Sequence, residues 1–323
     1  MNKRLLPWLL SLLLLFVSAA SLGETELVIT EPEPFTAYPE LSADGYLADA
    51  AGEFIHADRD AGVWVYLSGT LRVEIRRYRT VIKMRPVYWF ESEIWSKDGT
   101  VPRVFLADSE HPKKGHTRPE NIAKHRGVVY AQNGDLFTWR IDQKRKTGII
   151  IRDGVVVSNQ PYKKAVTAIP ALDELSLYAD GRMEVHSPGE LSGEAYLERG
   201  ALDVLSFGPI LLRNGETDAR LDGNFTAMEP RSAIGMVEPG HYIGLMVEGR
   251  NKRSNGASLA FVAQRLKTRG CTLAFNLDGG QTAAMIFMGE LVMETGKYNG
   301  YSNTRAQPDI IGIGHSTQVP TYP

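Results

Sequence analysis

Two adjoining runs of alternating apolar and polar residues decide the fold: Val63-Trp-Val-Tyr66 and Leu71-Arg-Val-Glu-Ile-Arg-Arg-Tyr78. A period of two residues is typical of antiparallel strands that bury one face. Ser68-Gly69 lies between the runs and supplies a turn. We therefore predict a β-hairpin. Beyond the hairpin, Tyr88-Trp-Phe-Glu-Ser-Glu-Ile-Trp95 is a further predicted strand. Its aromatic residues are expected in the core, with a sugar-stacking platform as the alternative.

The segment before the hairpin has the features of an exported protein. Lys3 and Arg4 precede an apolar run, Leu5 to Val17, and small residues follow up to Gly23. This order predicts a signal peptide over residues 1–23, with an uncleaved membrane anchor as the alternative. Residues 30–49 contain several prolines without periodicity and are expected to form an extended linker. We therefore expect an extracytoplasmic location, secreted or at the cell surface.

Composition excludes several classes of protein. Apolar residues make up 43% and charged residues 23% of the 323 residues, which is close to globular averages. The formal net charge of −2 gives no basic excess, so nucleic acid is not an expected partner. Cys271 is the only cysteine, so no internal disulfide can form. Its apolar neighbours, up to Phe275, indicate a buried strand residue rather than a nucleophile.

Two helices are predicted downstream. Thr117-Arg-Pro-Glu120 is a capping box that starts a helix from Arg118 to His125, and Gly127 ends it. Ser258 caps a second helix, which ends at Gly270. Residues 128–131, 147–157 and 184–194 are predicted as short strands. We therefore expect an α+β fold, with a mixed or antiparallel sheet core, a few flanking helices and a strand-rich N-terminal extension. We expect two regions after the signal peptide. Residues 24–117 form a linker and a strand-rich N-terminal region, and residues 118–323 form the main domain.

Two polar loops follow predicted strands directly: Asn133-Gly-Asp135 and Asn276-Leu-Asp-Gly-Gly-Gln281. Each combines a carboxylate with glycine, which lets the backbone approach a ligand closely. Both patterns are also ordinary turn chemistry, so neither decides the function alone. The Gly-x-Ser-x-Gly, His-Glu-x-x-His, P-loop and dinucleotide motifs do not occur. The spacing of His111, His116 and His125 matches no standard zinc pattern.

Several short motifs occur in a fixed order along the chain. They are Val128–Phe137, Phe207–Glu216, Pro230–Gly235, Val247–Arg250, Ser254–Leu259 and Ala274–Gln281. The ordered set resembles the phosphodiester glycosidase family, over roughly Pro119 to Gly314. The segment before Pro119 resembles the N-terminal part of bacterial secreted members, which are often described as exopolysaccharide-related. The resemblance implies a hydrolase that removes a sugar, such as N-acetylglucosamine, from a phosphodiester.

The resemblance also places the family's site on particular positions of this sequence. It implies catalytic roles for Asp278, Asp135 and Arg231. The substrate-binding positions that it implies are Asn133, Gly134, Gly208, Ser232, Glu248, Arg250, Gly279, Gly280, Gln281, Thr282 and Arg305. Two positions depart from the family pattern. Glu248 stands where the family has aspartate, and Gln281 stands where it has a third glycine, which is expected to narrow the site.

The reaction requires an anion clamp and a carboxylate. Phosphate is a better leaving group than a sugar hydroxyl, so strong general acid assistance is less needed. Arginine binds phosphate oxygens bidentately, and Arg231 is the first candidate, with Arg250 or Arg305 as the second. A carboxylate stabilises an oxocarbenium-like transition state or activates water. Asp278 is the leading candidate for this role and Asp135 is the second.

Other readings of these residues stay open. Arg231 could pair with Glu229 or Glu238 on the surface, where an ion pair contributes little. Asp278 and Asp135 could together hold a calcium ion, because carboxylate oxygens suit this cation. No other cofactor is expected.

Two hypotheses for the function follow. In the first, the protein is a secreted glycoside hydrolase that cleaves a sugar from a phosphodiester in a cell-surface or extracellular glycan. In the second, it is a non-catalytic polysaccharide-binding or exopolysaccharide-assembly protein that uses the same pocket. A carbohydrate partner is expected in both cases, and contact with a membrane only through an uncleaved signal.

Overall fold

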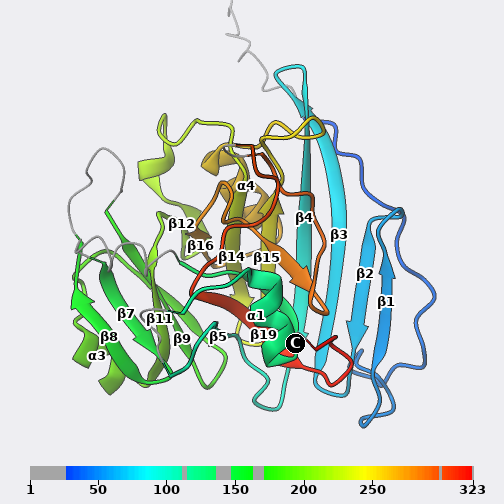
Figure 1. Cartoon of the computed structure of the whole chain (residues 1–323), viewed down its shortest axis with the longest axis horizontal. Helices are drawn as coiled ribbons and strands as arrows, with labels where there is room; N and C mark the ends of the chain where they lie inside the picture. The colour runs from blue at the N-terminus through cyan, green and yellow to red at the C-terminus, as the bar shows by residue number, and fades with distance from the viewer. Residues whose placement is uncertain (1–26, 111–114, 136–146, 163–170, 298–299, 322–323) are drawn as a thin grey trace, which may run out of the picture.

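The computed structural model describes residues 27–110, 115–135, 147–162, 171–297 and 300–321 (Figure 1). The predicted signal peptide and His111 lie outside the described residues. Within the described ranges, no helix has the length and apolar character needed to cross a membrane.

The largest sheet contains the predicted hairpin and has nine strands. In spatial order these are β1 (Phe54–Asp58), β2 (Val63–Leu67), β3 (Leu71–Ile82), β4 (Arg85–Ser96), β15 (His241–Val247), β14 (Arg231–Glu238), β16 (Leu273–Leu277), β12 (Ile210–Arg213) and β13 (Glu216–Thr217). The hairpin prediction is confirmed, because β2 and β3 pair antiparallel. β4 joins β15 along seven residue pairs, so the N-terminal strands and the later ones form one continuous sheet.

Two five-stranded sheets complete the β-structure. One has the order β10 (Met183–His186), β9 (Asp173–Tyr178), β11 (Ala201–Phe207), β7 (Gly148–Arg152) and β8 (Val155–Gln160). The other has the order β18 (Glu290–Leu291), β17 (Met285–Phe287), β6 (Val128–Asn133), β19 (Asp309–His315) and β5 (Arg103–Leu106). Every strand pair in the described part of the chain is antiparallel.

The second predicted helix is confirmed as α4 (Leu259–Thr268), since Ser258 Oγ accepts a hydrogen bond from the Phe261 amide. The first is α1 (Pro119–Arg126), which begins one residue later than predicted. The capping box predicted there is wrong. Thr117 instead pairs with Gln307 in a β-bridge, and the Glu120 carboxylate accepts from Thr304 Oγ1.

One predicted strand is partly wrong. β10 ends at His186, and the rest of the predicted segment, up to residue 194, leads into the helix α3 (Gly193–Glu198) and forms its first two residues. Ser192 starts this helix, because its hydroxyl accepts from the Ala195 amide. A short 3₁₀ turn, η1 (Ala219–Leu221), is the remaining helical element of the described residues.

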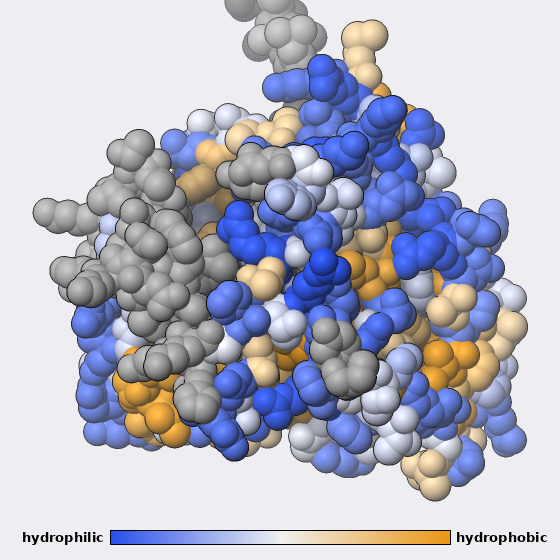
Figure 2. Space-filling model, in the orientation of Figure 1, coloured by the Kyte–Doolittle hydropathy of each residue, from blue (hydrophilic) through white to orange (hydrophobic). Residues whose placement is uncertain are grey.

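The three sheets share one hydrophobic core. It combines, for example, Phe90 and Phe275 of the large sheet with Leu205 of β11 and Ile311 of β19. α4 covers the opposite face of the large sheet, α1 packs on the sheet that contains β6, and α3 packs on the sheet that contains β9 (Figure 1). The fold is therefore mostly β, with few helices. Figure 2 shows that the outer face in this view is mostly hydrophilic, with apolar residues in separate small patches.

Candidate functional site

Four strands bring predicted site residues to one edge of the sheets. Leu277, the last residue of β16, pairs with Ser232 near the start of β14, and Ser232 pairs with Met246 near the end of β15. Asn133 ends β6, and its side-chain amide donates to the carbonyl oxygen of Asp278 at 2.8 Å. This edge lies at the end of the large sheet that carries the β3–β4 turn, at the top of Figure 1.

Asn133 fixes the position of the Asp278 loop. Its Nδ2 donates to the carbonyl oxygens of Asp278 and Gly134, and its Oδ1 accepts from the Ala284 amide. The side chain is 0% exposed. Asn133, expected to contact substrate, is therefore bonded within the chain and acts by holding β6 and the Asp278 loop together.

The loop after β16 requires its two glycines. A Cβ atom at Gly279 would lie 2.7 Å from the Pro230 carbonyl oxygen, so a side chain does not fit. Gly280 has a φ of +63°, and its amide donates to that same carbonyl oxygen. The resemblance implied that Gly280 is a substrate-binding position, but its amide is thus bonded within the chain. Asp278 stays half-buried at the mouth of this tight loop.

Arg250 lies against this loop. A Cβ at Gly280 would come 3.1 Å from its Nη1, and its Nε donates to Glu229 at 2.6 Å. Arg250 itself has a φ of +56°, a left-handed conformation that non-glycine residues seldom adopt outside turns and functional sites. The structure therefore places one guanidinium beside the Asp278 loop, oriented by a carboxylate.

Arg231 has a different position. Its partners are the carbonyl oxygens of Ala257, at 3.1 Å from Nε, and Ala227, at 2.8 Å from Nη2. It precedes Ser232 on β14, so its side chain points to the α4 face of the sheet, whereas Ser232 Oγ accepts from Gln132 on the other face. Desolvation lowers the pKa of Arg231. Of the two arginines, Arg250 is therefore the one that the structure brings to the loop.

Asp135 belongs to a buried charge cluster. Its Oδ2 accepts from the Ser206 amide at 2.8 Å, and its Oδ1 lies 3.6 Å from Nη2 of Arg152. Arg152 also donates to Asp309 Oδ2 from Nε at 3.0 Å and from Nη2 at 2.7 Å. A Cβ at Gly134 would lie 2.0 Å from Asp309 Oδ1, so the chain passes directly over this carboxyl group.

Burial sets the protonation of this cluster. Asp135 and Asp309 are 0% exposed and Arg152 is 3% exposed. Desolvation, opposed by the charge of Arg152 and reinforced by that of Asp135, raises the pKa of Asp309 to about 7. Burial of two carboxyl groups around one guanidinium thus favours the protonated form of Asp309.

The remaining predicted positions divide by exposure. Glu248 is 0% exposed and forms a bidentate ion pair with Arg253, and Ser232 and Thr282 are likewise buried. Gly208 is buried next to Asp173 and is followed by a cis peptide bond to Pro209.

Gln281 is half-buried, and its Nε2 donates to the Asn303 carbonyl oxygen. Arg305 is exposed, and its amide donates to the Gln281 carbonyl oxygen.

Sequence reasoning missed Arg152 and Asp309 as parts of this region, and it named Glu229 only as a possible partner of Arg231, whereas Glu229 pairs with Arg250. For Glu229 a signal was present. Pro239-Gly240 marks the turn of the β14–β15 hairpin, and counting outward from it places residue 229 opposite residues 249 and 250. For Arg152 and Asp309 there was none, because the contact joins strands of two different sheets.

The two expected calcium ligands, Asp135 and Asp278, have different surroundings in the structure. Among the described residues, no group of three or more histidine, cysteine or acidic side chains is arranged to hold an ion. Asp135, one of the two expected calcium ligands, lies beside the Arg152 guanidinium. Cys271 is buried, and desolvation raises its pKa to about 12, which fits a core residue.

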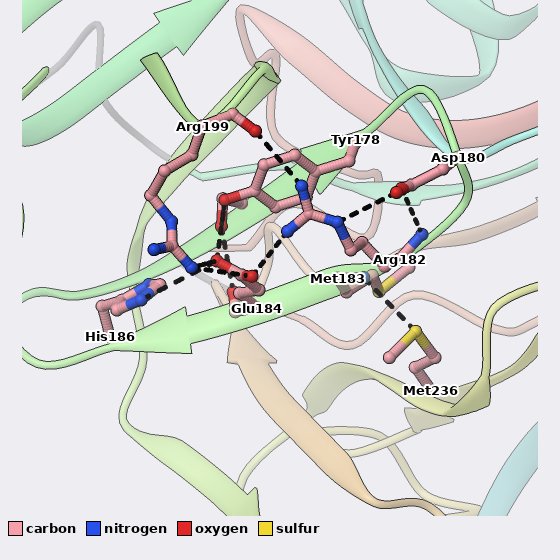
Figure 3. Close-up of polar contacts among 9 residues, drawn as sticks. Tyr178, Asp180, Arg182, Met183, Glu184, His186, Arg199 and Met236 are labelled. Atoms are coloured by element: carbon pink, nitrogen blue, oxygen red, sulfur yellow. Dashed lines mark hydrogen bonds and ion pairs between the residues drawn. The ribbon is translucent and has the colours of Figure 1, made fainter. Parts of the chain in front are cut away.

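A second polar cluster lies away from this edge, on β9, β10 and α3 (Figure 3). Glu184 accepts hydrogen bonds from the Tyr178 hydroxyl, Arg182 and Arg199. Burial alone would raise the pKa of Glu184, but the bonds from Tyr178 and Arg199 outweigh it and the pKa is lowered. Because each charge here is compensated, the cluster is best explained by its role in attaching α3 to its sheet.

Comparison with known proteins agrees with this fold. The catalytic domain of zebrafish N-acetylglucosamine-1-phosphodiester α-N-acetylglucosaminidase, in a form auto-inhibited by its pro-peptide, aligns with a TM-score of 0.61 and 22% identity. The alignment covers 77% of this chain and 84% of that domain. A hypothetical protein from Synechocystis aligns with a TM-score of 0.51 and 14% identity, over 76% of this chain and 62% of that one.

Sequence comparison identifies the family. The SPβ prophage-derived uncharacterized protein YomE of Bacillus subtilis is 26% identical over 175 residues, which is 53% of this chain and 26% of that protein. This chain therefore spans about a quarter of the length of that relative. Residues 126–314, more than half of the chain, match the phosphodiester glycosidase family, and the chain belongs to that family.

Proposed function

We propose that the protein is a phosphodiester glycosidase that hydrolyses the bond between the anomeric carbon of a sugar and a phosphodiester. Membership of the family supports the reaction class. The single observation that supports this site is the loop Asp278-Gly279-Gly280, with Arg250 directly against it. A carboxylate and a guanidinium are the two groups that the reaction needs.

Asp278 has the chemistry to stabilise positive charge on the anomeric carbon, or to activate the attacking water. Arg250 has the chemistry to bind the phosphate oxygens through its planar guanidinium, and the leaving phosphate gains negative charge as the bond breaks. Glu229 orients Arg250, and Asn133 holds the Asp278 backbone. In this proposal Asp135 supports the adjoining loop from within the buried cluster.

The proposed setting is outside the cytoplasm, on a cell-surface or extracellular glycan. The N-terminal signal pattern supports export. N-acetylglucosamine is the first sugar to test, because it is named for the zebrafish relative.

The experiment measures free sugar and phosphate monoester released from a panel of sugar 1-phosphodiesters by the purified chain. The panel includes N-acetylglucosamine, glucose and mannose derivatives, each with and without EDTA. We expect turnover with at least one sugar, and no turnover by Asp278→Asn at equal concentration. Loss of turnover in EDTA, restored by calcium, would add a metal to the site. Binding without turnover in every case would contradict the proposal and favour a non-catalytic glycan-binding protein.

A further inference from the structure

The turn between β3 and β4 projects beyond the rest of the large sheet. β4 pairs with β15 no further than Trp89, opposite Val247, whereas β3 and β4 stay paired up to Ile82 and Arg85. The four residues of strand between Arg85 and Trp89 span about 13 Å. The turn therefore stands clear of the candidate catalytic edge, and Figure 1 shows it at the top of the two strands.

Exposed apolar side chains gather at this turn. Met84 is 95% exposed, Val28 84% and Val81 50%, and Leu27 is exposed as well. These four are half of the eight large apolar side chains that are exposed in the described ranges. Single exposed residues of this kind are normal on a soluble surface, but a group of them marks a contact site.

The N-terminal linker supplies part of this group. Thr30 forms an antiparallel bridge with Arg79 of β3, and the Val28 carbonyl oxygen accepts a hydrogen bond from Thr80 Oγ1 at 2.7 Å. Counting back from the bridge places Val28 opposite Val81, and side chains of opposed residues lie on the same face of a sheet. The linker and the β3–β4 turn therefore present one apolar surface.

Basic side chains surround the apolar ones. Arg79, Lys83 and Arg85 are exposed, and residues 79–86 include no acidic residue. None of these three cations forms an ion pair with another described residue. The first acidic residue of the described linker, Glu31, lies on the side of the bridge away from the turn. Figure 2 shows apolar residues projecting among hydrophilic ones at the top of the molecule, where the turn lies in Figure 1.

The backbone of the turn is strained. Lys83 and Met84 have φ values of +50° and +61°, the left-handed conformation at both central positions of a two-residue hairpin turn. Asn-Gly is the usual pair at such positions, because it adopts positive φ at low cost. Both side chains are exposed, so packing within the described chain does not offset the strain. A contact outside the chain would account for lysine and methionine here.

We propose that the β3–β4 turn docks on an anionic lipid bilayer. The apolar side chains enter the headgroup region, and the three basic side chains lie beside lipid phosphates. Burial of apolar side chains together with attraction to anionic lipids is what holds peripheral proteins on membranes. The apolar side chains alone would suit a protein partner as well, but the uncompensated basic groups around them select a negatively charged surface with an apolar interior.

The N-terminal sequence brings a membrane to the same end of the molecule. The uncharged run Leu5–Leu22 ends five residues before Leu27, and five residues reach at most about 18 Å. A run held in the bilayer keeps the turn beside it. The sequence led us to expect membrane contact only through an uncleaved signal, whereas docking of the turn needs no such anchor. The docked turn directs the candidate catalytic edge toward the bilayer.

The experiment measures sedimentation with lipid vesicles of the chain without its predicted signal peptide, residues 24–323. All three sheets lie within this part of the chain. One kind of vesicle contains phosphatidylcholine alone, and the other contains about one-third phosphatidylglycerol. We expect binding to the anionic vesicles at low salt, and loss of this binding in about 0.5 M salt, which screens the attraction between charges.

Two variants of the turn test its role. Met84→Asn removes the most exposed apolar side chain and is expected to weaken binding at least about fivefold. Lys83→Asn combined with Arg85→Gln removes two charges and is expected to weaken binding at least about tenfold. Asparagine adopts positive φ more readily than lysine or methionine, so both variants should melt at or above the wild-type temperature. The matched control is Val155→Ser, at an exposed position on β8, which is expected to change binding less than about twofold.

Three results would overturn the proposal. The wild-type chain could fail to sediment with either kind of vesicle, or it could bind both kinds equally, so that charge plays no part. It could also bind the anionic vesicles while both turn variants bind as the Val155→Ser control does, which would place the contact elsewhere. Sedimentation needs no hydrolysis, so these outcomes do not depend on the proposed function.

Discussion

The loops after β6 and β16 have closely similar sequences, Asn133-Gly-Asp135 and Asp278-Gly-Gly280, yet their carboxylates have different surroundings. Asp278 is half-buried beside Arg250, whereas Asp135 is 0% exposed and lies between the Ser206 amide and Arg152. A carboxylate that acts on a substrate must reach it. The difference therefore favours Asp278 as the reacting carboxylate of the proposed hydrolysis, with Asp135 in a supporting role.

The largest effect on stability is expected from glycine substitutions in the two loops. Gly134→Ala would place a methyl group 2.0 Å from a buried oxygen of Asp309, and the surrounding sheets cannot move apart easily. We expect a loss of about 3 kcal/mol or more in the free energy of unfolding. Gly280→Ala meets only the mobile end of Arg250, and its left-handed backbone costs about 1–2 kcal/mol. Urea denaturation of both variants checks this order, and equal losses would contradict the distinction.

The buried cluster of Asp135, Arg152 and Asp309 is also expected to make the stability of the protein depend on pH. The unfolded chain releases the Asp309 proton near pH 4, whereas the folded chain keeps it until about pH 7. Folding therefore binds a proton between these values, and the free energy of unfolding falls as pH rises through this window. Asp309→Asn removes this group and should flatten the profile between pH 4 and 7. An unchanged slope in this variant would show that other groups cause it.

Substitutions of Arg250 and Arg231 are expected to affect different properties, turnover for Arg250 and stability for Arg231. Arg250→Gln is expected to lower kcat/KM for a sugar 1-phosphodiester about 10- to 100-fold, since it removes one charged hydrogen-bonding group from the phosphate. Arg231→Gln mainly removes bonds to the Ala227 and Ala257 carbonyl oxygens and should cost stability instead. Steady-state kinetics and thermal melts of both variants separate the effects. The opposite result would return Arg231 to the role that its sequence motif implied.

The smallest effect is expected from a substitution far from both loops, which serves as a control for the variants above. Ser258→Ala removes the cap of α4, on the far face of the sheet from Ser232, and should cost about 1 kcal/mol. It touches neither loop, so kcat and KM should stay within twofold of the wild-type values. A larger kinetic change would mean that general destabilisation alters turnover, and the Arg250 result would need correction for it.

The sequence predicted the parts of the fold that depend on local pattern. The β2–β3 hairpin and the Ser258 cap follow from alternation and from a hydroxyl at a helix start, and both are confirmed. The α1 capping box failed because Thr117 is bonded to Gln307, a partner 190 residues away. α3 was missed because its six residues are too few to show a periodic pattern.

The candidate site was predictable to a similar degree. Motif order brought Asp278, Gly279 and Arg250 into one set, and the structure places them together. It could not show that Asn133 and Ser232 are buried, since burial depends on how three sheets meet. The role of Arg152 was likewise beyond sequence pattern, because a charged residue on an apolar strand gives no sign of its distant partner.

The most direct test compares Asp278→Asn with the wild-type chain, on the best sugar 1-phosphodiester of the panel, together with a thermal melt of each. We expect kcat to fall by about a thousandfold or more, because the charge that stabilises the transition state is removed, while the midpoint of unfolding stays within about 3 °C. Wild-type turnover by a folded Asp278→Asn variant would contradict the proposal that Asp278 is the reacting carboxylate.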